Sequence, residues 1–196
     1  MNKDLTSKGT NSLSKILTTT PCQIVVSRGN SKSRLMLIGE APGASEEKLG
    51  KPFVGRSGKL LDNLLEAIGF DVDKDLYICN VIKCRPPNNR KPTKIEIARH
   101  LPWLNQQIKS INPYVIVVIG ATALEVVLGR KIKMSEIRGS WQKLDGIDVM
   151  PIFHPSYLLR NPSKACGSPF ELTRLDLFNV KEKLKVSFDI SLSADK

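Results

Sequence analysis

Short apolar runs alternate along the chain with stretches in which apolar residues recur at helical spacing. Strands are predicted from the apolar runs at residues 35–39, 76–83, 114–119 and 147–153. Helices are predicted between and after them, at residues 57–68, 97–111, 121–128 and 171–185. Strands that alternate with helices favour a parallel sheet with both faces covered. The expected fold class is therefore α/β.

Residues with strong local preferences mark where these elements begin and end. Ser57 is suited to cap the helix that follows it, and Gly69 to end that helix. Pro102 is expected to kink the helix at 97–111 or break it into two, because proline lacks the N–H that the helix needs. The organisation that we expect is a poorly ordered segment at 1–20, one domain at 21–186 and a flexible tail at 187–196.

Composition narrows the class of protein and of partner. The chain has 196 residues and 41% hydrophobic content, which suits one soluble domain. We see neither a membrane span nor a secretory leader, and expect a cytoplasmic monomer. The formal net charge of +11 favours a polyanionic partner such as nucleic acid, although the charge alone does not specify DNA. Basic residues without acids gather at 83–94.

The cysteines give no sign of a disulfide framework. Cys22, Cys79, Cys84 and Cys166 include no C-x-x-C pair. Disulfides are unusual in a chain in which no signal peptide is seen, so we expect four reduced thiols.

Three polar residues stand at or near the ends of separate predicted strands. Glu40 follows the first strand, Asn80 lies late in the second, and His154 follows the last. Each alone could be structural, as a turn residue, a strand-end polar group or a capped loop histidine. Ligands of parallel α/β sheets bind beyond the carboxyl ends of the strands, so the three together indicate a site.

Five motifs resemble those of family 4 uracil-DNA glycosylases, in the same order and at the same spacing. They are GEAPG at 39–43, GKPFVGRSG at 50–58, NVIKCRPP at 80–87, RGSW at 138–141 and HPSYLLRNP at 154–162. The resemblance covers roughly residues 20–185. It implies a three-layer α/β/α sandwich with a short parallel sheet, and removal of uracil from DNA. Neither the G-x-G-x-x-G fingerprint nor a P-loop is present, which disfavours a generic nucleotide-binding domain.

The resemblance also implies roles in catalysis and base recognition. His154 would donate a hydrogen bond to uracil O2 as negative charge develops there. Asn80 would match uracil N3–H and O4, which cytosine presents inverted. Glu40 would position water and offset the cationic sugar, although better-known uracil glycosylases use an aspartate one position later, at Ala41.

Further residues complete the implied substrate site. Phe53 resembles the aromatic residue that stacks on the flipped base, with a core phenylalanine as the alternative. Gly39 and Ala41 belong to the same binding motif as Glu40. Glu46 or Glu47 would crowd the uracil C5 edge and exclude thymine, with a solvated acidic turn as the alternative.

Contacts to DNA are implied for a second group of residues. Leu158 would be the wedge that enters the base stack as the nucleotide leaves it. Phosphates would be held by the polar and basic residues Ser156, Arg160, Lys83, Arg85 and Arg90, each of which could instead be an ordinary surface residue.

The chain departs from the family at the iron-sulfur cluster. Family 4 members usually hold a [4Fe-4S] cluster through four cysteines, and the corresponding positions here are Ser12, Lys15, Cys84 and His100. One thiolate and one imidazole do not suffice for a cluster that takes four thiolates. We therefore expect neither a metal nor a cofactor. The alternative is a cluster that uses Cys22 and Cys79 as substitute ligands.

Two other functions fit parts of the pattern. A related branch crosslinks itself to uracil-DNA through a histidine in an inserted loop, but no R-x-H insertion accompanies RGSW here. A non-catalytic DNA-binding or scaffold module derived from a glycosylase is the second alternative, and the presence of Glu40, Asn80 and His154 argues against it.

Overall fold

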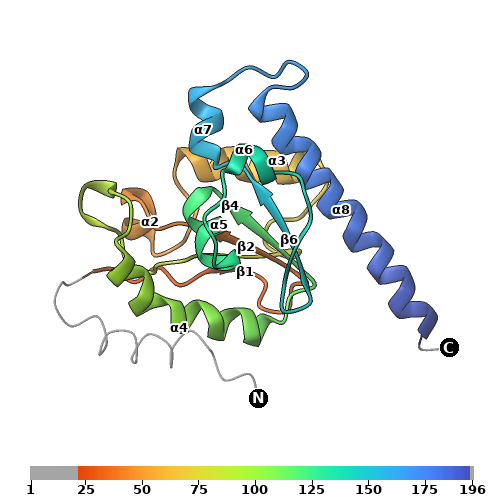
Figure 1. Ribbon diagram of the computed structural model, residues 1–196, viewed down its shortest axis with the longest axis horizontal. Coiled ribbons are helices and arrows are strands. Elements are labelled where there is room, and N and C mark those ends of the chain that lie inside the picture. The colour runs from red at the N-terminus through yellow and green to blue at the C-terminus, as the bar shows by residue number, and fades with distance from the viewer. Residues whose placement is uncertain (1–21, 195–196) are drawn as a thin grey trace.

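A mixed sheet of six strands lies between two layers of helices in the computed structural model (Figure 1). The structure describes residues 22–194, with side chains as far as residue 186. The strands are β1 (Arg28–Gly29), β2 (Leu35–Gly39), β3 (Leu76–Asn80), β4 (Val115–Ile119), β5 (Gln142–Leu144) and β6 (Ile147–Ile152). Their order across the sheet is β1-β3-β2-β4-β6-β5.

The four central strands run parallel, as the sequence predicts, whereas both edge strands are antiparallel. β3, β2, β4 and β6 form the parallel part, and β1 and β5 pair with β3 and β6 in the opposite direction. The sequence prediction missed both edges. β1 has only two residues and β5 three, and neither carries an apolar run that would mark a buried strand.

Helices cover the two faces of the sheet and confirm the expected three layers. One face packs against α3 (Arg56–Ala67), α7 (Pro155–Arg160) and α8 (Pro169–Ala194), and the other against α4 (Lys94–Ile111), α5 (Ala121–Leu128) and α6 (Met134–Ile137). Successive strand residues point to opposite faces, so Leu35 and Leu37 enter one core while Met36 and Ile38 enter the other. The short helix α2 (Ala44–Leu49) and the 3-10 turn η1 (Pro87–Asn89) lie in the loops after β2 and β3.

Several helix boundaries differ from those expected. Gly55, not Ser57, is the N-cap of α3, while Gly69 follows the end of this helix with a φ of +83°, as predicted. α4 is a single helix that runs through Pro102. Pro102 and Ala98, whose carbonyl loses its partner, are both exposed, so water can satisfy that carbonyl.

The last helix is longer than the sequence indicates. α8 continues to Ala194, so the backbone of most of the predicted flexible tail is helical. The predicted poorly ordered segment at 1–20 lies outside the described residues. Within the described part of the chain, no helix is long and apolar enough to cross a membrane.

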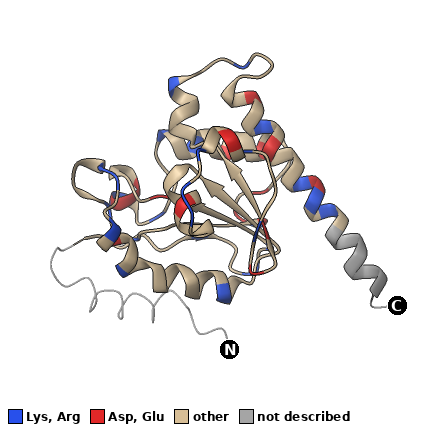
Figure 2. Ribbon diagram, viewed as in Figure 1, with Lys and Arg blue, Asp and Glu red and all other residues tan. Residues whose placement is uncertain are grey.

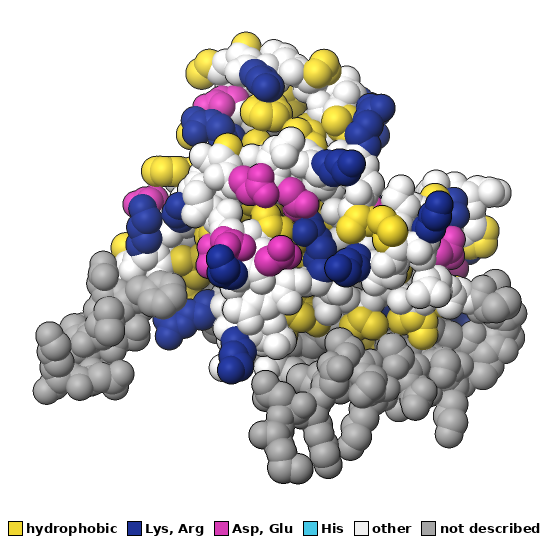
Figure 3. All heavy atoms as spheres, turned by 180° about the vertical axis from the view of Figure 1, so that it is seen from behind, with side chains coloured by type: hydrophobic (Ala, Val, Ile, Leu, Met, Phe, Trp, Pro, Cys, Tyr) yellow, Lys and Arg dark blue, Asp and Glu magenta, His cyan; other side chains and the backbone are white. Residues whose placement is uncertain are grey.

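Charges of both signs are spread over the molecule. Basic and acidic residues follow one another along the described part of α8 (Figure 2). On the face seen from behind, acidic and basic side chains mix with apolar ones (Figure 3). The excess of positive charge is therefore not gathered into a single patch on that face.

A buried ion pair ties the RGSW motif to α8. Arg138 donates from Nε to Oδ2 of Asp176 at 2.9 Å and from its terminal nitrogen to Oδ1. Asp176 is only 1% exposed, and burial raises the pKa of its carboxyl group. Arg138 compensates the negative charge of this buried carboxylate.

Replacing Arg138 with methionine should lower the free energy of unfolding by about 3–5 kcal/mol, because an unpaired buried charge remains. Urea denaturation at pH 7 measures this change. Arg174→Met is the matched control, since Arg174 pairs with Glu171 on the surface of the same helix, and should have little effect. An equal decrease in the free energy of unfolding in the two variants would contradict the role of Arg138 as the partner of a buried charge.

Candidate active site

A cavity of about 260 Å³ opens where the carboxyl ends of the parallel strands meet the loops that follow them. Glu40 follows β2, Asn80 ends β3, and His154 lies two residues beyond β6. All three line the cavity, as predicted from the sequence. The segments that follow these strands, including the first turns of helices, supply the other lining residues, which are Ala41, Pro42, Gly43, Glu46, Phe53, Ser57, Pro86, Asn89, Arg90 and Ser156.

Asn80 carries an unsatisfied polar atom into this cavity. Its residue is 2% exposed, and Oδ1 has no hydrogen-bond partner among the described residues. Gly39 pairs with Asn80 at the end of the β2–β3 ladder, and a Cβ at Gly39 would lie 2.5 Å from this oxygen. Only a residue without a side chain fits beside this buried oxygen. A buried acceptor without a partner costs about 1–3 kcal/mol, which a ligand that donates a hydrogen bond would recover.

Phe53 stands beside Asn80 on a strained loop. Its φ of +54° is unusual for a residue with a side chain. The ring is buried next to Gly39, where a Cβ would collide with it, and its centroid lies 6.2 Å from that of His154. The two rings are tilted by 33° to one another, and both residues line the cavity.

The carboxylate of Glu46 holds the Phe53 loop in place. Oε1 accepts from the N–H groups of Val54 and Gly55 at 3.0 and 2.7 Å, and Oε2 accepts from Gly43 at 3.1 Å. Both oxygens are thus bonded to the backbone. Glu46 lines the cavity, as predicted, and also clamps the two loops that form it.

His154 is held in one tautomer. The backbone N–H of Ser156 donates to its Nδ1 at 3.1 Å, and the Ser156 hydroxyl lies 2.8 Å from the same nitrogen. A backbone N–H can only donate, so Nδ1 must be the unprotonated nitrogen and Nε2 carries the proton in the neutral ring. Burial lowers the pKa of His154 to about 4, with Arg160 acting in the same direction and Glu46 against it. The ring is therefore a neutral donor through Nε2.

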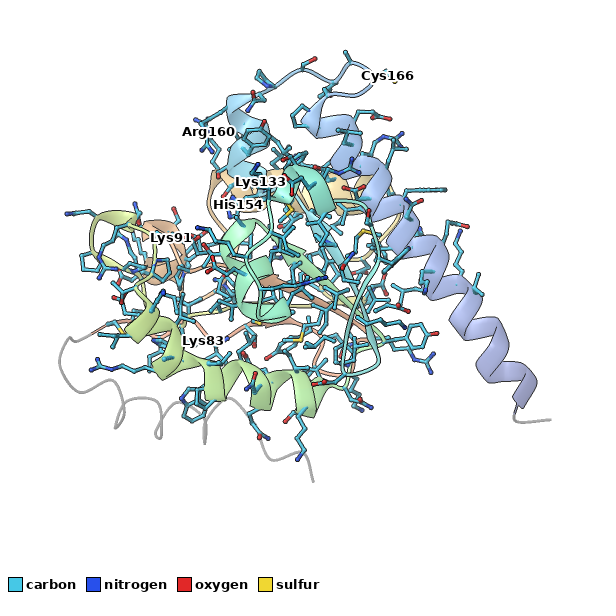
Figure 4. The ribbon with its side chains drawn as sticks, viewed as in Figure 1. Lys83, Lys91, Lys133, His154, Arg160 and Cys166 are labelled. Atoms are coloured by element: carbon cyan, nitrogen blue, oxygen red, sulfur yellow. A yellow bond between two sulfur atoms is a disulfide. The ribbon has the colours of Figure 1, made fainter. Side chains whose placement is uncertain are left out.

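Two residues predicted to contact DNA are buried in this structure. Lys83 is 1% exposed and lies against α4 (Figure 4), where its Nζ donates to the carbonyl of Asn80 at 2.5 Å. Leu158 is also 1% exposed and packs in the core. Tyr157 is an exposed aromatic residue of α7, and the centroid of its ring lies 5.1 Å from that of Phe153.

The other predicted DNA contacts have protein partners or lie at the surface. Arg85 donates to Glu47 at 3.1 Å and to Oδ1 of Asn89 at 2.7 Å, which ties the η1 turn to α2. Arg90 forms two bonds with Glu96. Arg160 is exposed at the end of α7, above His154 in Figure 4.

Comparisons with known proteins show the family of this chain. The family model that matches residues 26–178 is described as the uracil DNA glycosylase superfamily. This chain belongs to the uracil-DNA glycosylase superfamily. It is 48% identical to the type-4 uracil-DNA glycosylase of Thermotoga maritima over 81% of this chain and 80% of that protein. The type-4 uracil-DNA glycosylase of Saccharolobus solfataricus is 42% identical over 70% of this chain and 68% of that protein. The type-5 uracil-DNA glycosylase of Pyrobaculum aerophilum is 29% identical over 69% of this chain and 67% of that protein.

Type-4 uracil-DNA glycosylases normally bind an iron-sulfur cluster, and the described residues of this chain do not fit one. Cys84 is bonded to Cys22 in a disulfide, which corrects the expectation of four reduced thiols. His100 is buried and accepts the N–H of Lys83 on Nδ1 at 3.3 Å. Nowhere in the described part of the chain do three histidine, cysteine or acidic side chains gather as metal ligands do.

The other positions of the family's cluster pattern and the other cysteines are placed as follows. Ser12 and Lys15, the other two positions of the family pattern, are outside the described residues. Cys79 is buried and Cys166 exposed, and both are free thiols. Cys22 lies next to Cys84 because the chain from residue 22 runs beside the loop after β3, where Val25 N donates to the Lys83 carbonyl at 2.8 Å.

Sequence reasoning missed several lining residues. Ser57 has a residue type that suits a helix cap, and Pro86 and Asn89 belong to a segment whose sequence indicates only turns. Asn89 lines the cavity with a φ of +54°, a conformation that asparagine tolerates better than most residues. A pair of asparagines after two prolines was the available signal, but it does not reveal which side chain faces inward.

Protein stability should fall as the pH decreases from 6.5 to 4.5. Burial lowers the pKa of both His154 and His100 to about 4, so in this range the unfolded state binds protons that the folded state does not. Urea denaturation across the range measures the slope. The double variant His100→Gln, His154→Gln should flatten it, and an unchanged slope would contradict the buried neutral state of these rings.

Proposed function

We propose that this chain is a DNA glycosylase that hydrolyses the N-glycosidic bond of deoxyuridine in DNA, releasing uracil and leaving an abasic site. The observation that carries this proposal is the unpaired Oδ1 of Asn80 inside a cavity shared with His154 and Phe53. Uracil offers N3–H to that oxygen. Cytosine has an acceptor at N3 and would leave two acceptors facing each other.

His154 stabilises the departing base. Negative charge develops on uracil O2 as the glycosidic bond breaks, and a donor fixed in advance lowers the energy of that state. The Nε2–H of a neutral imidazole serves this purpose without transferring its proton. Ser156 keeps the proton on Nε2 through its bonds to Nδ1.

Glu40 and Phe53 complete the chemistry. Glu40 lines the cavity and its backbone carbonyl accepts from Ile82 N at 3.2 Å, which fixes the residue at the end of β2. Its carboxylate orients the water and offsets positive charge on the sugar. Phe53 stacks on the flipped base, while Gly39 and Ala41 leave space for it.

The DNA backbone lies over a second groove beside the cavity. This groove is lined by hydroxyl and guanidinium groups that suit phosphates, from Ser45, Arg56, Ser57, Ser156 and Arg160. We propose a monomeric enzyme whose partner is uracil-containing DNA, with a cytoplasmic location.

The enzyme works without an iron-sulfur cluster in this proposal. Its support is the chemistry of the remaining positions, since Cys84 is bonded to Cys22 and Nδ1 of His100 faces a backbone N–H. The Cys22–Cys84 bond then holds the chain before β1 against the loop after β3. A cluster would hold the same region through its thiolates.

Purified protein should contain no stoichiometric iron and should show the matching pattern of thiols. Alkylation without reductant should modify Cys166 in the folded protein and Cys79 only after unfolding, because Cys79 is buried. Cys22 and Cys84 should react only after reduction, and mass spectrometry of the alkylated peptides distinguishes these cases. A cluster spectrum, or rapid alkylation of Cys84 without reductant, would contradict a cluster-free enzyme.

The central test is alkaline cleavage of a labelled oligonucleotide that contains one U·G pair. Wild type should generate abasic sites, and His154→Ala should slow the single-turnover rate by about 10²–10³-fold, because one preorganised donor is lost. Asn80→Asp should shift preference from uracil towards cytosine, while Asn105→Asp on the exposed side of α4 should not. An inactive wild type that still binds DNA would instead indicate a scaffold module.

A further inference from the structure

Lys83 is a fully buried lysine that the proposed mechanism does not use. Its side chain is enclosed between the end of β3 and α4, and the residue is 1% exposed. Burying an ammonium group costs several kcal/mol unless acceptors surround it. Its position three residues after Asn80 places it directly behind the residue proposed to select the base.

The ammonium group has two hydrogen-bond acceptors and a thiol as its partners. Nζ donates to the main-chain carbonyl of Asn80 at 2.5 Å and to Oε1 of Gln107, and it interacts with the thiol of Cys79. Burial lowers the pKa of this ammonium group, and Cys79 acts in the opposite direction. Two of the partners belong to the end of β3, and the third belongs to α4.

Gln107 is itself held in the orientation that Lys83 requires. Its Nε2 donates to the hydroxyl of Tyr77 at 2.9 Å and to the carbonyl of Val26 at 3.3 Å. With the amide nitrogen engaged in this way, Oε1 is left to accept from Lys83. The network therefore runs from the chain before β1 through α4 to the carbonyl of Asn80.

The backbone of Lys83 is anchored as well. Its N–H donates to Nδ1 of His100 at 3.3 Å, and its carbonyl accepts from Val25 N at 2.8 Å. Main chain and side chain of one residue thus bind β3, α4 and the segment before β1. A lysine placed for phosphate contact would expose its ammonium group, and this one points away from solvent.

We propose that Lys83 is a positioning residue for base recognition, which fixes the main chain of Asn80 so that its unpaired Oδ1 faces the uracil N3–H. This inference rests on the proposed function and deepens it. Without the ammonium group, the carbonyl of Asn80 loses a buried bond and the strand end can rotate. Oδ1 is then no longer fixed in one position, and the preference of the site for uracil over other bases decreases.

The test compares Lys83→Met, which keeps the length of the side chain but has no donor, with Lys91→Met. Lys91 is an exposed lysine of the same loop, shown at its edge in Figure 4. Three quantities are measured in the full chain: the single-turnover rate on U·G, inhibition by free uracil, and the salt dependence of binding to abasic-site DNA, which has no base for Asn80 to hold.

Lys83→Met should slow excision and raise the inhibition constant of free uracil, each by about tenfold or more. Its affinity for abasic-site DNA and the salt dependence of that affinity should stay as in wild type. Lys91→Met should leave the inhibition by uracil unchanged. Normal uracil inhibition in Lys83→Met, or a weakened salt dependence in that variant, would overturn the proposal.

A second variant covers the case in which Lys83→Met does not fold. Gln107→Leu keeps the lysine and its bond to Asn80 but removes one of its two hydrogen-bond acceptors, so it should weaken uracil inhibition in the same direction by a smaller factor. Normal inhibition in this variant, when Lys83→Met cannot be obtained, would reject the positioning role. Wild type is the separate test of function, since a wild type that neither excises nor binds uracil rejects the glycosylase itself.

Discussion

The pairing of Gly39 with Asn80 at the end of the β2–β3 ladder is the constraint on which the site depends. Parallel strands end at the same edge of a sheet, so the two residues are brought side by side by register alone. One has no side chain and the other carries an amide, which leaves a space with an acceptor at its back. Phe53, Glu40 and His154 are arranged around that space by the loops that leave the same edge.

The loops around the site are held by polar groups rather than by apolar packing. Glu46 gathers three backbone N–H groups, Arg85 joins α2 to the η1 turn, and Lys83 joins β3 to α4. The bonds of Arg85 and Lys83 connect segments that are distant in sequence. Charged residues near the cavity therefore serve mainly to set the shape of the protein, and the groups left over for a ligand are few.

Much of the fold and of the site was predictable from the sequence, because the features concerned are local. Apolar runs gave the four parallel strands, and motif order placed Glu40, Asn80, Phe53 and His154 near one another. The antiparallel edges were missed, since two or three residues carry too little pattern to mark a strand.

The sequence did not reveal the direction of some side chains or the contacts between distant segments. Lys83 was expected to hold a phosphate or to lie at the surface, yet hydrogen-bond acceptors at the end of β3 and on α4 make its burial possible. Leu158 was expected to meet DNA, but the turn of α7 directs it into the core. The Cys22–Cys84 bond depends on a contact across 62 residues, which spacing in the sequence cannot reveal.

The unpaired oxygen of Asn80 also bears on how this protein could be engineered or could drift. An apolar residue of similar size at this position would remove an unsatisfied group from the interior, so selection for thermostability alone would favour its loss. Stability and recognition therefore make opposite demands on one residue. A sequence optimised without regard to the base would become a more robust protein and a poorer reader of DNA.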